Sequence, residues 1–186
     1  MRKVTIFENI AINGFFSDAD NSVQWAHEGG GDPEFAAFSA SNAGRGGVLI
    51  FGRITYDLMA SFWTSDAARK AMPEVAKGMG ASQKLVFSRT LKKSDWENTR
   101  IVNTDPVEEV RKLKAQDGPG MAILGSGSIA AQLAAANLID DYQFVVSPVV
   151  LPAGRTLFEG VGRKLKLIES RTFKNGKVYL RYEPGS

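Results

Sequence analysis

The sequence predicts an α/β fold of three layers, in which a mainly parallel central sheet has helices on both faces and ends in a C-terminal antiparallel hairpin. Three short apolar runs, 48–51, 84–87 and 121–124, are bounded by glycine or polar residues, which is typical of strands buried on both faces of a parallel sheet. Helical patterns alternate with these runs. Later in the chain only strand patterns occur, and Asn175-Gly176 is a strong hairpin signal between two of them.

The elements can be justified in chain order. Residues 3–12 are rich in β-branched residues, which predicts a first strand, and residues 15–31 are polar, aromatic and glycine-rich, which indicates a long loop of a kind that is often functional. Asp32 can cap a helix that begins at Pro33 and ends before Gly44. The remaining predictions are a strand at 48–51, a helix at about 55–61, strands at 84–87 and 101–102, a helix capped by Asp105, a strand at 121–124, a helix at 128–137, a strand at 142–150 and hairpin strands at 165–173 and 177–182.

Composition limits the classes of function. The 186 residues are 44% hydrophobic and 23% charged, as in an ordinary globular protein, and predict a single domain over residues 1–186. The absence of cysteine excludes disulfides, zinc fingers and iron–sulfur clusters, and the single histidine leaves a metal site almost without ligands, so no metal is expected. No apolar run reaches about 18 residues and no signal-like segment develops, which predicts a cytoplasmic protein without a membrane partner.

The one local excess of basic charge, Arg163–Arg181, alternates with apolar residues. This alternation places the charges on the solvent face of a hairpin, and aromatic residues are not interleaved with them as in nucleic-acid-binding proteins. Nucleic acid is therefore not an expected partner.

Glycine, arginine and hydroxyl residues follow the predicted buried strands. The segments are Gly52-Arg53-Ile54-Thr55, Ser88-Arg89, Asn103-Thr104 and Gly125-Ser126-Gly127-Ser128. In open α/β sheets, ligands bind beyond the carboxyl ends of the strands, where glycine allows close approach and arginine and helix N-termini bind phosphate. This set indicates a dinucleotide site, and its two arginines favour NADP over NAD. The alternative is that the glycines serve only ordinary strand-to-helix turns.

Four blocks of the sequence together resemble the dihydrofolate-reductase-type fold, in the branch typified by the reductase domain of bacterial riboflavin biosynthesis. They are Gly52-Arg53-Ile54-Thr55-Tyr56, Ser88-Arg89, Leu124-Gly125-Ser126-Gly127-Ser128-Ile129, and the run from Leu138 through Pro148 to Phe158. The resemblance covers nearly the whole chain. The order and spacing of the blocks make it more specific than any single glycine motif.

The resemblance implies a reductase that takes hydride from NADPH, usually as a homodimer. By position, it implies that Gly52, Arg53 and Thr55 hold the phosphates and the adenosine end, Ser88 and Arg89 the 2′-phosphate side, and Gly125, Ser126, Gly127, Ser128 and Ile129 the pyrophosphate. The apolar run Tyr142–Val146 is a candidate edge strand that would pair across the dimer.

The expected substrate contacts are Asn13, Gly14, Phe16 and Trp25, because the turn after the first strand is similar to the segment that borders the nicotinamide in that family. The aromatic members could stack on a flat heterocycle or pack the loop on the core. The branch commonly has Asp where this chain has Asn13, and a smaller or basic residue where it has Phe15, which leaves the substrate open.

The predicted function is therefore an NADPH-dependent reductase of a small heterocyclic substrate, resembling 5-amino-6-(5-phosphoribosylamino)uracil reductase. Alternatives are a dihydrofolate or pterin reductase, a flavin-binding oxidoreductase and a non-catalytic NADPH-binding module. Dihydrofolate reductases use a carboxylate on the first helix, where this chain offers Asp32 and Glu34, but Asp32 is also a good helix cap. His27 is either an acid or a surface residue. The sequence assigns no proton donor, and water could serve.

Overall fold

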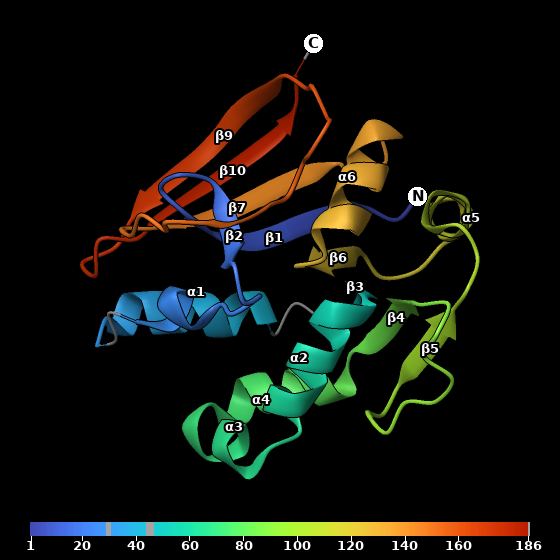
Figure 1. The fold of residues 1–186 in the computed structure, drawn as a ribbon, viewed down its shortest axis with the longest axis horizontal. Coiled ribbons are helices and arrows are strands. Elements are labelled where there is room, and N and C mark those ends of the chain that lie inside the picture. The colour runs from blue at the N-terminus through green and yellow to red at the C-terminus, as the bar shows by residue number, and fades with distance from the viewer. Residues whose placement is uncertain (29–30, 44–46, 186) are drawn as a thin grey trace.

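The computed structural model describes residues 1–28, 31–43 and 47–185, and its centre is an eight-stranded sheet of order β5-β4-β3-β6-β1-β7-β10-β9 (Figure 1). The five pairings from β5 to β7 are parallel, and β10 runs antiparallel to both β7 and β9. The predicted mainly parallel sheet with an antiparallel hairpin is confirmed. The strands are β1 (Val4–Ala11), β3 (Val48–Gly52), β4 (Gln83–Phe87), β5 (Thr99–Val102), β6 (Met121–Leu124), β7 (Asp141–Ser147), β9 (Leu165–Thr172) and β10 (Val178–Pro184).

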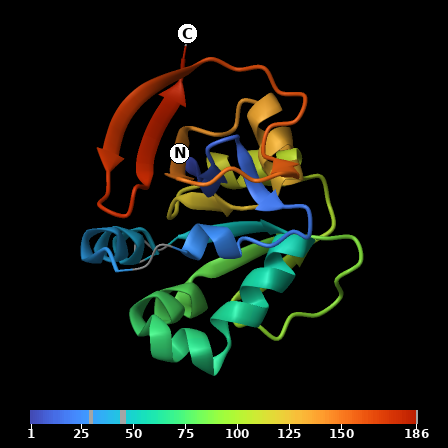
Figure 2. The ribbon, with the colours of Figure 1, turned by 60° about the vertical axis from the view of Figure 1, so that its left-hand side comes forward.

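Helices cover both faces of the sheet, which gives the three predicted layers (Figures 1 and 2). One face carries α5 (Pro106–Ala115) and α6 (Gly127–Ala135), and the other carries α1 (Pro33–Ala43), α2 (Arg53–Trp63), α3 (Asp66–Ala71) and α4 (Pro73–Ala81). The main core lies between the sheet and α5 and α6, where Ile6, Ile50 and Ile123 of three neighbouring strands meet Leu133. Within the described residues, no helix is both long and apolar enough to cross a bilayer.

Two aspartates cap helices as predicted. Asp32 Oδ1 accepts hydrogen bonds from the backbone N–H groups of Glu34 and Phe35 at 3.0 and 3.2 Å, and Asp105 Oδ1 accepts from those of the second and third residues of α5 at 2.9 and 3.0 Å. Each carboxylate satisfies N–H groups that have no partner inside the helix. Residues 29–30 of the predicted loop and Gly44–Gly46 after the first helix lie outside the described residues.

Some elements differ from the prediction. The predicted loop contains β2 (Phe15–Asp18), which pairs antiparallel with β8 (Gly154–Thr156), and the 3-10 helix η1 (Gln24–His27). α2 extends two residues beyond the predicted helix at each end, and α3 and α4 were not predicted because these short segments have few large apolar residues. β7 ends at Ser147 rather than 150. The prediction of β7 as an edge strand is wrong, because it lies between β1 and β10 and the sheet ends at β5 and β9.

Candidate functional site

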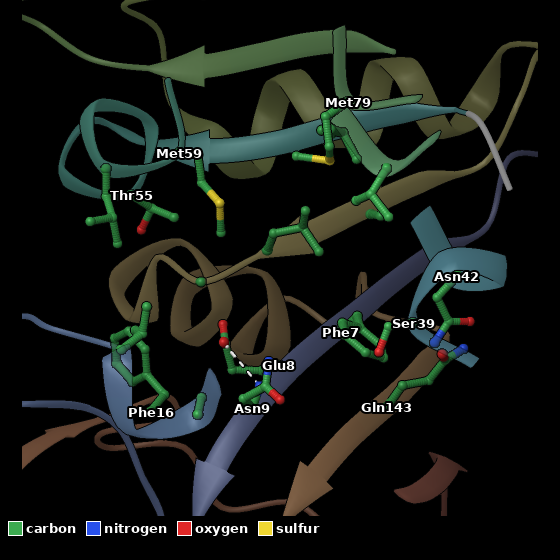
Figure 3. Close-up of a pocket in the computed structure, with 18 of the residues that line it drawn as sticks. Phe7, Glu8, Asn9, Phe16, Ser39, Asn42, Thr55, Met59, Met79 and Gln143 are labelled. Carbon is green, nitrogen blue, oxygen red and sulfur yellow. Dashed lines mark hydrogen bonds between the residues drawn. The ribbon is translucent and has the colours of Figure 1, made fainter. Parts of the chain in front are cut away.

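A cleft of about 990 Å³ lies on the face of the sheet that carries α1, α2 and α4, and it continues past the end of β6 to the start of α6, where Glu8 and Gly127 line it. Its walls are largely apolar, and Figure 3 shows Phe7, Met59 and Met79 among them. In the same view Glu8, Asn9, Phe16 and Thr55 lie at the end of the cleft to which β1 and β3 point, and Ser39, Asn42 and Gln143 lie toward the other end. The cleft therefore combines an apolar middle with polar groups at both ends, as small-molecule sites do.

The topology of the sheet explains where the cleft opens. β1 and β6 are paired only as far as Phe7 and Leu124. Beyond this pair, β6 leads into α6 on one face of the sheet, whereas the chain after β1 leads to α1 on the other face. Ligands of open α/β sheets bind where successive connections leave in opposite directions. The predicted location at the carboxyl ends of the strands agrees with this geometry.

Two helix N-termini meet at this end of the cleft. The N-cap residues are Gly52 for α2 and Ser126 for α6, and neither helix has a side-chain hydrogen bond at its cap. The Gly52 N–H donates to Ser126 Oγ at 2.6 Å, which holds the two turns together. The first N–H groups of a helix have no partner within the helix and carry its positive partial charge. The paired termini can therefore bind an anion such as a phosphate.

The turn between β6 and α6 is packed so closely that it requires glycine. Gly125 has a φ of +59°, and a Cβ on it would lie 2.7 Å from Thr55 Cγ2. A Cβ on Gly127 would lie 2.9 Å from the Thr156 carbonyl oxygen and 3.0 Å from Phe16 Cε1. The structure thus brings the predicted cofactor residues of α2 and of the β6–α6 turn into direct contact, and it adds the β2–β8 ribbon as a third wall.

The predicted 2′-phosphate residues occupy the outer rim. The half-exposed Arg53 guanidinium donates to Thr90 Oγ1 at 2.8 Å and to Asp57 Oδ2 at 3.2 Å, so it lies against the loop after β4. Ser88 Oγ accepts from the Leu91 N–H at 2.9 Å and shapes that loop, while Arg89 is exposed to solvent. Arg53 borders the cleft, whereas Ser88 and Arg89 do not line its described walls.

Ile129 has a different role from the one predicted. Its side chain is 5% exposed and packs in the main core, and its N–H donates to the Ser126 carbonyl at 2.9 Å. It stabilises the first turn of α6 from beneath and does not face the cleft.

Of the four predicted substrate contacts, Phe16 is the one that lines the described part of the cleft. The Asn13 side chain is engaged with Leu151, whose carbonyl accepts from Nδ2 at 2.8 Å and whose N–H donates to Oδ1 at 3.3 Å. Gly14, with a φ of +85°, completes the turn after β1. Trp25 packs against Ala11 and Leu151 in a small buried cluster, which agrees with the packing alternative and not with stacking on a ligand.

Glu8 lines the cleft and was not identified from the sequence. Its residue is 8% exposed, Oε1 accepts from the Asn9 N–H at 3.1 Å, and Oε2 is buried without a hydrogen-bond partner among the described residues. Burial raises the pKa of this carboxyl from 4.5 to about 8, although hydrogen bonding from the backbones of Asn9 and Gly125 partly opposes the shift. The only signal in the sequence was a glutamate in register with the inward-facing Val4 and Ile6.

A buried lysine closes the cleft near α1. Lys177 is 3% exposed, and its Nζ donates to the Ala26 carbonyl at 2.8 Å and to Ser147 Oγ at 3.0 Å. Burial lowers the pKa of this ammonium. His27 lies nearby on the exposed rim, and desolvation and the charge of Lys177 lower its pKa, which favours the neutral imidazole.

The carboxylates of the first helix are committed to structural contacts. Asp32 caps α1 and also accepts from the Asn175 N–H at 3.2 Å, and Glu34 forms an ion pair with Arg171. Among the described residues, no three His, Asp or Glu side chains are grouped as metal ligands would be.

Comparison with known proteins identifies a family and two relatives that are similar along the chain. The family model described as "RibD C-terminal domain" matches residues 2–179. Two Bacillus subtilis (strain 168) proteins are similar along the chain: uncharacterized protein YyaP is 27% identical over 183 residues, or 97% of this chain and 94% of its own, and YwjB is 24% identical over 184 residues, or 97% of both.

Solved structures share the fold at low identity. A putative riboflavin biosynthesis protein from Shewanella sp. PV-4 has a TM-score of 0.74 and 20% identity, with 99% of both chains covered. A diaminohydroxyphosphoribosylaminopyrimidine deaminase/5-amino-6-(5-phosphoribosylamino)uracil reductase from Thermotoga maritima has a TM-score of 0.69 and 14% identity, with 99% of this chain and 57% of the other covered. A pyrimidine reductase-like protein from Corynebacterium diphtheriae has a TM-score of 0.64 and 13% identity, with 100% and 92% covered.

Proposed function

Because this chain belongs to the RibD C-terminal domain family, we propose that it is a reductase that uses NADPH to reduce a small heterocyclic substrate. Family membership and reductases among the neighbours in fold support the reaction class. The cofactor and the substrate class are inferred from the chemistry of the cleft.

The observation that carries the proposal is the meeting of two helix N-termini without side-chain caps at the mouth of an apolar cleft. Free N–H groups at the starts of α2 and α6 suit a pyrophosphate, and the glycines at positions 125 and 127 let Thr55, Thr156 and Phe16 pack closely around the turn that presents them. Arg53 on the rim suits an additional phosphate, as on the ribose of NADPH. NADPH, when bound, supplies a hydride to the substrate.

The deeper part of the cleft suits a flat heterocycle. Phe7, Leu49 and Leu124 provide apolar walls, and Gln143 and Asn42 provide amide groups at the far end. Asn42 Nδ2 is buried without a hydrogen-bond partner among the described residues, so it is a donor available to a ligand. A pyrimidine or pterin has the ring carbonyls and nitrogens that could pair with these amides.

Binding of NADPH and NADH, measured by calorimetry in parallel at one salt concentration, tests the cofactor assignment. The double substitution Arg53→Ala and Arg89→Ala should weaken NADPH by about 10- to 100-fold, because charged hydrogen bonds contribute about 1.5–3 kcal/mol, and should change NADH little. Arg69→Ala removes a comparable exposed arginine on α3 and is the matched control. Equal losses for both nucleotides would contradict the 2′-phosphate assignment, and no binding to the wild type would contradict the cofactor.

The reaction is tested by stopped-flow oxidation of NADPH with 5-amino-6-(5-phosphoribosylamino)uracil and with 7,8-dihydrofolate. Saturable turnover of either distinguishes a reductase from a non-catalytic binding module. A yellow purified protein with a tightly bound flavin would instead favour the flavin-dependent alternative.

A further inference from the structure

We propose that Glu8 is the proton donor of this reductase, an inference that rests on the proposed function and identifies a catalytic residue for it. Reduction of a C=N or C=O bond needs a proton as well as a hydride, and a positioned side chain normally provides it. The carboxylates of the first helix are engaged elsewhere, so the donor has to be sought in the walls of the cleft.

The position of Glu8 is set by the parting of two strands. The residue follows the last β1–β6 pair, Phe7 and Leu124, and lies beside the turn at Gly125. It is therefore adjacent both to the paired helix N-termini that suit the cofactor phosphates and to Phe7, which lines the apolar part of the cleft. Figure 3 shows Glu8 next to Asn9 at the same end of the cleft as Phe16.

The surroundings of Glu8 are apolar. On β1 the neighbours on its face are Ile6 and Ile10, and across the β1–β7 ladder it lies opposite the buried Phe144. No lysine, arginine or histidine forms an ion pair with it in the part of the chain that the structure describes. An ionised carboxylate would be compensated there only by the backbone N–H groups of Asn9 and Gly125, so the neutral acid is the favoured form.

Several of the charged groups that border the same cleft have other partners. Arg53 is bonded to Asp57 and the loop after β4, Arg155 Nη1 donates to Asn21 Oδ1 at 3.0 Å, and Asp141 is paired with Arg181. Lys177 donates to Ala26 and Ser147, and His27 lies on the exposed rim with a lowered pKa that favours its neutral form. None of these groups has an interaction with Glu8 that would draw off its proton.

The two carboxyl oxygens have different environments. Oε1 accepts from the Asn9 N–H, whereas Oε2 has no hydrogen-bond partner within residues 1–28, 31–43 and 47–185. A buried polar atom without a partner is uncommon and has a cost in stability. The missing partner of Oε2 is explained if this oxygen carries the proton and donates it to a ligand that binds in the cleft.

The step is balanced with the proposed cofactor. The O–H bond of Glu8 breaks, its electron pair stays on the carboxylate, and the proton goes to the nitrogen or oxygen of the substrate double bond. The carbon of that bond receives the hydride, and the two-electron oxidation is that of NADPH to NADP⁺. The Glu8 carboxylate then regains a proton from solvent when the product leaves.

The protonation state can be measured without turnover. In protein labelled with ¹³C at the glutamate δ carbons, one resonance should titrate with a midpoint of about 8 and should disappear in Glu8→Gln. Titration of every glutamate in the ordinary range would overturn the proposal, whatever the enzyme activity.

The catalytic role is tested in the same variant. Glu8→Gln should bind NADPH as the wild type does but should oxidise it about 10²- to 10⁴-fold more slowly in single turnovers with the two substrates named above. The wild-type rate should decline above about pH 8, as the acid ionises, and the variant should lack this decline. Glu183→Gln, which removes an exposed carboxylate on β10, is the matched control.

The outcomes separate the two proposals. Wild-type turnover that Glu8→Gln leaves unchanged would overturn the role of Glu8 and leave the reductase proposal intact. A wild type that binds no NADPH, or turns over neither substrate, would overturn the reductase proposal and the catalytic role with it.

Discussion

Replacement of Glu8 by glutamine should make the protein more stable at neutral pH. The folded state holds the carboxyl at a pKa of about 8, whereas the unfolded chain ionises near 4.5. Between these values the unfolded state binds fewer protons, so the free energy of unfolding falls as pH rises, by about 1.4 kcal/mol per pH unit. Below pH 4.5 both states are protonated and the residue contributes no pH dependence. The wild type should therefore lose about 3 kcal/mol by pH 7 and about 5 kcal/mol by pH 8, a loss that the neutral amide of Glu8→Gln escapes.

The assay is urea unfolding of the wild type and Glu8→Gln at intervals from pH 5 to pH 8.5. The difference in unfolding free energy should widen steadily as the pH rises and stop widening above about pH 8. The exposed-site variant Glu183→Gln should run parallel to the wild type. Parallel curves for Glu8→Gln as well would show that the carboxyl is ionised in the folded protein, and the reasoning from its burial would be refuted.

Three further predictions concern the fold and the assembly. Gly125→Ala should lower the free energy of unfolding by about 1–3 kcal/mol and weaken the binding of NADPH, because the added Cβ would meet Thr55. Gly160 also has a positive φ, +75°, but a Cβ there would meet open space, so Gly160→Ala should lower the free energy of unfolding less. Equal losses for the two variants in urea unfolding would contradict the packing argument. Asp105→Ala should lower the free energy of unfolding by about 1 kcal/mol through loss of the α5 cap, and an unchanged value would show that the cap is dispensable. If a homodimer forms through the exposed edge strand β9, Leu167→Asp should convert it to a monomer in analytical ultracentrifugation, and an unaltered dimer would locate the contact elsewhere.

Local patterns were sufficient to predict most of the fold. The three apolar runs became β3, β4 and β6, the aspartate caps define the starts of α1 and α5, and Asn175-Gly176 forms the hairpin turn with Gly176 at a φ of +82°. Each of these signals is contained in a few consecutive residues. α4 and the β2–β8 ribbon were missed because they pack against distant segments, and α3 was missed because its six residues show no clear apolar period.

The site was predictable where it depends on strand ends. Gly52, Thr55 and the β6–α6 turn are brought together by the parallel topology alone. Glu8 was not predictable, because its environment is assembled from Phe16, Phe144 and the Gly125 turn, which are far apart in the chain. The orientation of the Trp25 side chain could not be predicted from the sequence either, since an aromatic residue in a loop can face either a ligand or the core.

The central position of β1 has a consequence for synthesis of the chain. Its partners, β6 and β7, are translated about 110 residues or more after β1 ends, so this strand waits unpaired while the rest of the sheet is made. During that wait the apolar run Val4–Phe7 is a potential aggregation segment, and the Glu8 next to it carries a negative charge because the unfolded carboxyl ionises near 4.5. The same side chain thus opposes aggregation of the unfolded strand as an anion, and it is buried in the folded protein as a neutral acid.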